Sequence, residues 1–336
     1  MTQAYFFRYW KGVLKTLFVA ALLYFLGKKG FISLEATGRA FYNPGKLVPG
    51  MLLLVISSFL AAWRWHILMR AQNIRIPGRR TLQLAFVGLF FNIALPGAVS
   101  GDFVKAFYVA KEIQSKKGYA FGSILFDRVA GLSALVLLSA GALFLEFNSL
   151  RGTALLKGIQ VFITISAVCV LAFFTYLFLV REKHDPLLWL FRWLEKQHAS
   201  AGSLTRIYEG IRVYHARKLV VIKIMLISLV IHVMVCSACV MFARALGEDG
   251  VPVLPVFIVV PLGLLVTAIP ILPAGVGTGH AAFGWLFQFL GSQRGADLFS
   301  LFALTQFMIG GIGGLVYLKF KSKAPKLELP ATGEMQ

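Results

Sequence analysis

The chain carries a series of apolar segments whose lengths match the thickness of a lipid bilayer. A helix needs about 20 predominantly apolar residues to cross the hydrocarbon core. Only 14% of the residues are charged, whereas a soluble domain has about 25%. The sequence therefore predicts an all-α polytopic membrane protein, with residues 1–336 in a single integral membrane domain. The candidate membrane segments are 12–27, 47–69, 81–110, 119–145, 154–180, 219–246, 252–290 and 297–318.

The formal net charge of +20 would suggest nucleic-acid binding in a soluble protein. Here Lys and Arg lie mostly between the apolar segments, as they do in the cytoplasmic loops of membrane proteins. We therefore expect a membrane environment and no nucleic-acid partner. The first segment follows basic residues but ends in YFLGKKGF without a small-residue cleavage site, so we interpret it as a retained membrane helix and not a signal peptide.

Two segments, 81–110 and 252–290, differ from the rest because Pro and Gly interrupt them. Basic residues flank the first on both sides, which favours a cytoplasmic position for both of its ends. An acidic turn precedes segment 252–290, which favours a position outside the cell for its start. The basic tail 319–336 is then cytoplasmic only if segment 252–290 enters and leaves the membrane on the outer side. The pattern predicts about six spanning helices and two re-entrant helical hairpins that enter from opposite faces. Interrupted segments in corresponding halves, here with LPGAV and LPAGV at their tips, indicate an inverted-repeat transporter.

This threading places both termini in the cytoplasm and the protein in the cytoplasmic (inner) membrane, with the basic loop 28–46 as the one poor fit. The loop 181–218 carries eight Lys and Arg and an apolar helix face, which favours an amphipathic helix in the cytoplasmic interface. Cys236 and Cys239 spell CxxC within a membrane segment. We interpret them as small packing residues, not as a metal or redox pair.

The first interruption, NIALPGAVSGDF, places a carboxylate directly after a helix break. Pro96, Gly97 and Gly101 open the backbone, Asn92 can satisfy the freed groups, and a second half-helix is predicted to begin near Ser100 or Asp102. Irregular backbone inside a membrane occurs only where it is buried in protein or lines a cavity. The half-helix N-terminus is a natural place for an anionic headgroup. Asp102 either caps this helix, or attracts a cationic amine or pairs with Lys105, although its own charge would repel an anion.

Asp127 and Arg128 lie just inside the next predicted span. Intramembrane charges are costly and are functional candidates by default. Arg128 can face Asp102 or present its planar fork to a phosphate. The alternative is a purely structural network of Asp102, Lys105, Asp127 and Arg128.

The second interruption, IPILPAGVGTGH, ends in His280, which is either a titrating group or a hydrogen-bonded filler. No strand precedes its glycines, so they do not indicate a dinucleotide site. His66 and His232 are interpreted as packing residues. The sequence has no HExxH, GxSxG, P-loop or zinc-site spacing, so we expect no metal and no cofactor.

FNIALPGAVSGDFVKAF followed by FDRVAGL resembles the flippase-type membrane domain of lysylphosphatidylglycerol synthases, which also occurs alone in small membrane proteins. The family pattern is Asn, Pro-Gly, Gly-Gly-Asp with a basic residue three positions on, and then Asp-Arg in the next span. Ser100 replaces a usual Gly, Lys105 stands where Arg is commoner, and His280 occupies a position where Glu is frequent. The matching residues are Asn92, Pro96, Gly97, Gly101, Asp102, Lys105, Asp127 and Arg128.

The resemblance implies a transporter that moves anionic, aminoacylated or polyprenyl-phosphate-linked lipids between leaflets. The expected headgroup site lies between the half-helix ends, with Arg128 and Lys105 on the phosphate, and Asp102 and Asp127 orienting these cations or contacting an amine. The synthase domain of the fused members is absent from the sequence, so lipid aminoacylation is not expected. The second hairpin contributes Pro273, Gly275, Gly277, Gly279 and His280 to the expected site.

Two other functions stay open at this point. One is an integral-membrane enzyme acting on a lipid phosphate, although no nucleophile and base accompany the charges. The other is a scaffold that recruits a glycosyl- or aminoacyl-transferase through 181–218. A homo-oligomer is also possible, because four glycines in the last span permit close helix packing within or between chains: Gly310, Gly311, Gly313 and Gly314.

Overall fold

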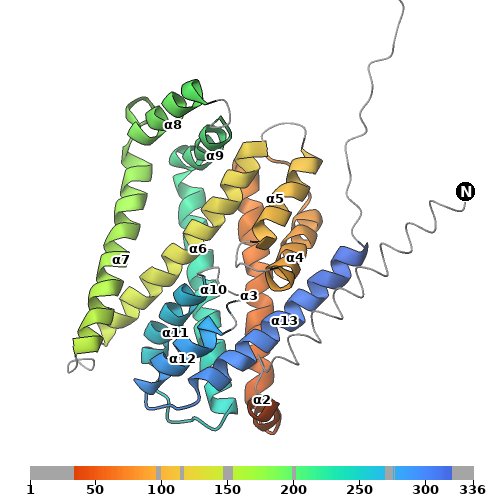
Figure 1. Ribbon diagram of the computed structural model, residues 1–336, viewed down its shortest axis with the longest axis vertical. Helices are drawn as coiled ribbons and strands as arrows, with labels where there is room; N and C mark the ends of the chain where they lie inside the picture. Colours follow the sequence, from red (N-terminus) through yellow and green to blue (C-terminus); the bar gives the residue numbers. More distant parts are fainter. Residues whose placement is uncertain are drawn as a thin grey trace, which may run out of the picture.

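The computed structural model describes residues 34–95, 100–113, 117–146, 154–198, 202–268, 275 and 277–319, and within these ranges it consists of helices joined by turns and short loops, with no strand (Figure 1). Two short 3-10 turns, η1 (Glu182–His184) and η3 (Val213–Ala216), join the α-helices. The α-helices are α2 (Leu34–Phe41), α3 (Pro44–Ala71), α4 (Gly78–Ala94), α5 (Ser100–Glu112), α6 (Lys117–Leu145), α7 (Ala154–Leu179), α8 (Pro186–Gln197), α9 (Gly202–Arg212), α10 (Lys218–Ala245), α11 (Val253–Thr267), α12 (Thr278–Gln288) and α13 (Gly295–Lys319).

Five of these helices are long and apolar enough to cross a membrane: Pro44–Ala71, Lys117–Leu145, Lys157–Leu179, Lys218–Ala245 and Gly295–Lys319. They coincide with five of the six full spans predicted from the sequence. The sixth, 12–27, lies outside the described residues. The prediction of an all-α polytopic membrane protein is confirmed.

The two interrupted segments form helical hairpins. At the open end of the first, the Arg80 guanidinium on α4 pairs with Glu112 on α5, with 2.5 Å between Nη2 and Oε1. Since Arg80 is near the start of α4 and Glu112 ends α5, the segment enters and leaves at one end of the molecule. In the second hairpin, a Cβ on Gly263 of α11 would lie 2.5 Å from the Phe283 ring of α12.

The hairpins open toward opposite ends of α10. Near the start of α10, Gln72 after α3 donates through Nε2 to the carbonyl of Gly210 on α9, at 2.8 Å, and the first hairpin follows directly along the chain. At the other end of α10, Arg294 after α12 lies 3.6 Å from Glu248. Figure 1 shows α4 and α5 toward one end of the bundle, and α11 and α12 toward the other. Their placement relative to a bilayer is taken up under the proposed function.

Helix α13 packs against both hairpins through glycines. A Cβ on Gly313 would lie 2.1 Å from the carbonyl oxygen of Phe86 on α4, and one on Gly310 would lie 2.1 Å from Ile93. Gly314 also faces α4, whereas a Cβ on Gly311 would meet nothing within 4 Å. Three of the four glycines in this span therefore serve packing within the chain. Cys236 and Cys239 of α10 are buried and not disulfide-bonded, as expected for packing residues.

Candidate functional site

Asp102, in the first turn of α5, holds two cations at the inner end of the first hairpin. Its Oδ1 lies 2.7 Å from Lys105 Nζ, one turn further along the same helix. Its Oδ2 lies 2.5 Å from Nε of Arg128, which comes from α6. The Asp102 residue is 4% exposed, so both contacts are ion pairs in a water-poor setting. The contact with Arg128 is also a charge-assisted hydrogen bond, a strong kind of bond. Of the two arrangements considered for Arg128, the structure shows the approach to Asp102.

The two cations differ in how they are held. The Lys105 ammonium lies 5.0 Å from the centre of the Trp65 ring, within the range of a cation–π contact. The side chain of Lys105 is only 13% exposed, whereas that of Arg128 is 40% exposed. Arg128 is therefore the more accessible cation, and Asp102 fixes the Nε edge of its guanidinium.

Arg128 lines a narrow crevice between α5 and α6. The crevice has a volume of about 40 Å³, and its apolar wall consists of Phe103, Phe121, Ile124 and Leu125. Phe103 and Leu125 are exposed on the side of the bundle. Arg128 comes eleven residues after Lys117, the first residue of α6, which places it about 16 Å along that helix. The guanidinium therefore lies well inside a helix of membrane-spanning length, beside an apolar outer surface.

The break in the first hairpin is secured by short polar contacts. The Gly101 amide donates to Asn92 Oδ1 at 2.8 Å, which is the role expected for Asn92, and the Ser100 hydroxyl donates to the Phe91 carbonyl at 2.9 Å. A Cβ on Gly101 would lie 1.9 Å from the Gly88 carbonyl oxygen. Only glycine at 101 allows α4 and α5 to approach so closely. Pro96 and Gly97 lie outside the described residues.

Asp127 belongs to a different cluster. Its carboxylate forms a two-point pair with Arg64 of α3, at 2.8 Å to Nε and 3.0 Å to Nη2. The third nitrogen of Arg64, Nη1, donates to the Ser228 hydroxyl of α10 at 2.8 Å. The Asp127 carboxylate therefore joins three spans and does not orient Lys105 or Arg128. The sequence analysis missed Arg64, although its charge within the predicted span 47–69 is a signal of the same kind.

His280 in the second hairpin is part of a hydrogen-bonded chain. Its Nδ1 accepts from the Gly277 amide at 3.3 Å, and its Nε2 lies 3.0 Å from the Ser300 hydroxyl on α13. Since Ser300 donates to the Ala296 carbonyl, Nε2 carries the proton and the ring is neutral in this arrangement. The geometry matches the hydrogen-bonded alternative for this histidine.

The glycines of the second hairpin have conformational and packing roles. Gly275 and Gly277 adopt φ of 68° and 87°, in the left-handed region that glycine enters without strain. A Cβ on Gly279 would lie 2.1 Å from the Phe299 ring of α13. Pro273 lies outside the described residues. Within the described ranges, no three His, Cys, Asp or Glu side chains gather as metal ligands would.

Comparison with known proteins identifies the family of the chain. The family model described as the transmembrane region of lysylphosphatidylglycerol synthase matches residues 12–313. The chain belongs to this family. The UPF0104 membrane protein PH1989 of Pyrococcus horikoshii is 27% identical over 162 residues, which cover 46% of this chain and 47% of that protein. The chain thus spans about half the length of this relative. No solved structure matches the chain.

In this member of the synthase transmembrane family, the residues that carried the resemblance divide between two ion clusters. In one cluster, the Asp102 carboxylate binds both Lys105 and Arg128. In the other, Asp127, which precedes Arg128 in the sequence, pairs with Arg64. Adjacent residues on a helix point about 100° apart, because the helix has 3.6 residues per turn. The Asp-Arg pair in α6 therefore serves two different helix contacts.

Proposed function

We propose that the protein moves a lipid with an anionic headgroup between the leaflets of the cytoplasmic membrane. The observation that carries this proposal is the geometry at Asp102, a buried carboxylate that holds an accessible arginine about 16 Å along α6, a helix of membrane-spanning length. An anion-binding guanidinium at this depth is costly in hydrocarbon unless protein groups stabilise it. A lipid phosphate entering between α5 and α6 would meet the cation while its tails stay outside.

The side chains would act on the headgroup in distinct ways. Arg128 would contact the phosphate, because its guanidinium offers several donors in a planar fork. Lys105 would add positive charge from beneath Trp65, and the start of α5 would add the partial positive charge of a helix N-terminus. Asp102 would hold both cations in place. Asp127 would act indirectly, by fixing α6 against α3 through Arg64.

The substrate class follows from the charge of this cluster. Two cations on one carboxylate leave a net positive site, which favours a phosphodiester or a polyprenyl-linked phosphate. An aminoacylated phospholipid would present the same phosphate, with its amine directed away from the cations. The hairpins would be re-entrant, the first from the cytoplasmic side, where Arg70, Arg75, Arg79 and Arg80 precede it.

The test is leaflet translocation of labelled lipids in liposomes that carry the purified protein. We expect movement of phosphatidylglycerol, of its lysyl ester or of a polyprenyl phosphate, and its loss in Arg128→Gln and Asp102→Asn. Lys46→Gln is the matched control, because it removes an exposed ion pair with Asp249 at the opposite end of the molecule. The scaffold alternative predicts the reverse pattern, with no movement by wild type and no effect of Arg128→Gln on a partner transferase.

A further inference from the structure

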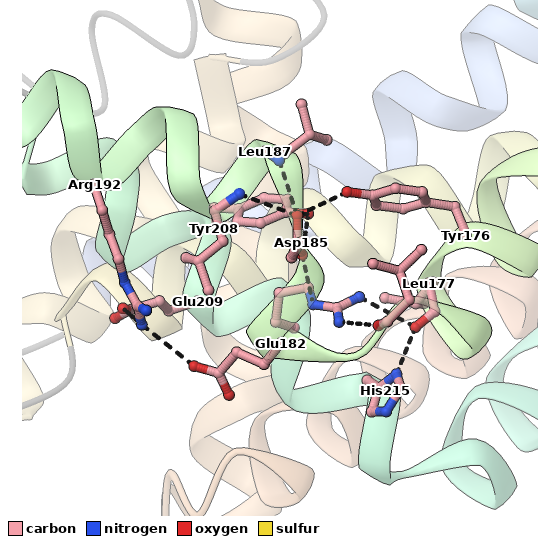
Figure 2. Close-up of polar contacts among 12 residues, drawn as sticks. Tyr176, Leu177, Glu182, Asp185, Leu187, Arg192, Tyr208, Glu209 and His215 are labelled. Carbon is pink, nitrogen blue, oxygen red and sulfur yellow. Dashed lines mark hydrogen bonds and ion pairs between the residues drawn. The ribbon is translucent and has the colours of Figure 1, made fainter.

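In the segment 181–217, which we call the cap, a buried carboxylate joins α8 and α9 to the end of α7. Asp185 is almost fully buried, and Figure 2 shows side chains from two helices converging on it. Its Oδ1 accepts from the Tyr176 hydroxyl of α7 at 2.7 Å, and its Oδ2 accepts from the Tyr208 hydroxyl of α9 at 2.9 Å. It also lies 3.0 Å from Arg212 Nε. Asp185 therefore connects the end of α7 to α9.

The same carboxylate fixes the start of α8. Oδ1 accepts from the amides of Leu187 and Leu188 at 3.0 Å each, which is the geometry of a helix N-cap. Arg212 further donates to the carbonyls of Leu177 and Val180 at the end of α7. These contacts set the direction in which α8 leaves α7, and Figure 1 shows α8 turned across the end of that helix.

Helix α8 buries one face and exposes another apolar face. Leu188 points inward and is buried, and Phe191 is half-buried. Trp189 is 69% exposed and Trp193 is 47% exposed, with Leu187 and Leu190 exposed beside them. At 100° per residue these four side chains form one continuous sector that points away from the bundle. A contiguous apolar surface of this kind indicates contact with lipid or with another protein.

Positive charge borders the apolar sector. Arg192 and Lys196 are exposed on one flank of α8, and Arg181 and Lys183 are exposed just before it. The one acidic residue of the helix, Glu195, faces α9, where a Cβ on Gly202 would lie 2.6 Å from its carboxylate. Arg192 lies 3.3 Å from the exposed Glu182 and 3.1 Å from Glu209, which balance its charge. The basic residues Lys196, Arg181 and Lys183 therefore supply the positive charge beside the exposed tryptophan and leucine side chains.

We infer that this outer face of α8 is seated in the interface of the bilayer that α7 crosses, in contact with anionic lipid headgroups. Tryptophan concentrates at the membrane–water interface, because its ring is apolar and its N–H is polar. An amphipathic helix with basic residues beside the apolar face binds to anionic leaflets in this orientation. A protein partner fits less well, because protein interfaces are depleted of lysine.

The interfacial position of α8 would be coupled to the candidate site through helix packing. Helix α9 packs on α6 at glycines, where a Cβ on Gly122 would lie 2.7 Å from the Ile207 carbonyl and one on Gly210 would lie 2.9 Å from Tyr119 Cα. Such close contacts transmit displacement, because packed interiors have little free space. The position of α8 in the leaflet therefore bears on α6, the helix of Arg128. The inference that α8 lies in the interface does not depend on the proposed transport activity.

The experiment is a spin-label accessibility measurement on the full chain in vesicles. Cys169, Cys236 and Cys239 are first replaced by Ala, and Trp189→Cys, Trp193→Cys or Glu182→Cys then carries the label. We expect labels at 189 and 193 to be accessible to oxygen and shielded from a water-soluble nickel chelate. The label at 182, where an exposed acidic side chain lies in η1 outside the apolar sector, is the control and should show the opposite pattern.

Varying the lipid composition of the vesicles tests whether α8 prefers anionic headgroups. We expect labels at 189 and 193 to lie deeper in vesicles that contain phosphatidylglycerol than in phosphatidylcholine alone. Equal depth in the two would overturn the anionic preference. Nickel accessibility at 189 and 193 equal to that at 182 would show that the face lies in water. Shielding of 189 and 193 from both oxygen and the nickel chelate would show that a protein covers the face. Either of these two results would overturn the inference that α8 lies in the interface.

Discussion

Arg64 on α3 and Asp127 on α6 form a two-point ion pair inside the bundle, with nitrogen–oxygen distances of 2.8 and 3.0 Å. Both side chains are nearly fully buried. A charge buried in this way depends on its partner, because the protein interior solvates it poorly. Since Ser228 of α10 accepts a further bond from Arg64, the pair fixes the relative positions of three membrane spans.

Replacing one partner should therefore destabilise the fold. We expect Asp127→Asn to lower stability by about 3–5 kcal/mol, the usual cost of leaving a buried charge unpaired. The double variant Arg64→Met with Asp127→Leu should recover much of this loss, because it removes both charges together. The measurement is the midpoint of heat-induced unfolding in detergent, with Lys46→Gln as the control. Equal midpoints for Asp127→Asn and wild type would contradict the pair's structural role.

The first hairpin should not tolerate a methyl group at its closest approach. We expect Gly101→Ala to destabilise the protein by about 1–3 kcal/mol, as overpacking typically does, because the added Cβ would meet the Gly88 carbonyl at 1.9 Å. Gly311→Ala is the control, since that position has open space around it. The same unfolding measurement compares the two. A larger loss at 311 than at 101 would mean that the approach of α4 to α5 is not needed for stability.

Much of the fold could be predicted because hydrophobicity and charge act along the chain. Segment length and hydrophobicity predicted the five described spans, and Pro and Gly marked the two interrupted segments. The basic flanks of 81–110 indicated that both of its ends lie on one side. The observed pair of Arg80 and Glu112 closes that hairpin as expected. Asn92 was also predictable, since a freed amide in hydrocarbon must find a partner.

The partners of the charged residues were less predictable, because they depend on how helices rotate against one another. Asp127 and Arg128 are neighbours in sequence, yet their side chains reach α3 and α5 respectively. Arg64 was visible as an intramembrane charge, but nothing local assigns it to Asp127. Likewise, Asp185 binds side chains of α7 and α9. The spacing of these residues along the sequence does not reveal that they come together.

The planar fork at position 128 should matter as well as its charge. We expect Arg128→Lys to retain part of the lipid movement that Arg128→Gln loses, because lysine keeps the charge but offers no fixed pair of donors. The partial activity should fall further as salt is added, since a point charge without fixed bonds is screened more readily. Liposome translocation at two salt concentrations makes the comparison. Full activity of Arg128→Gln would contradict a direct phosphate contact.

The attachment of the cap should weaken in acid through Asp185. Burial alone would raise the pKa of this carboxyl, but bonds from Tyr176, Leu188 and Tyr208, together with Arg212, outweigh it and hold the pKa below its ordinary value. A carboxyl with a lowered pKa stabilises the folded state fully above its ordinary pKa of about 3.9, and the contribution is lost as the pH falls through the lowered value. Hydrogen exchange of the α8 amides, corrected for the intrinsic effect of pH, should therefore accelerate below about pH 4. Asp185→Asn should exchange faster at neutral pH and lose the acid-dependent step, whereas an unchanged step in that variant would assign the effect to another carboxyl.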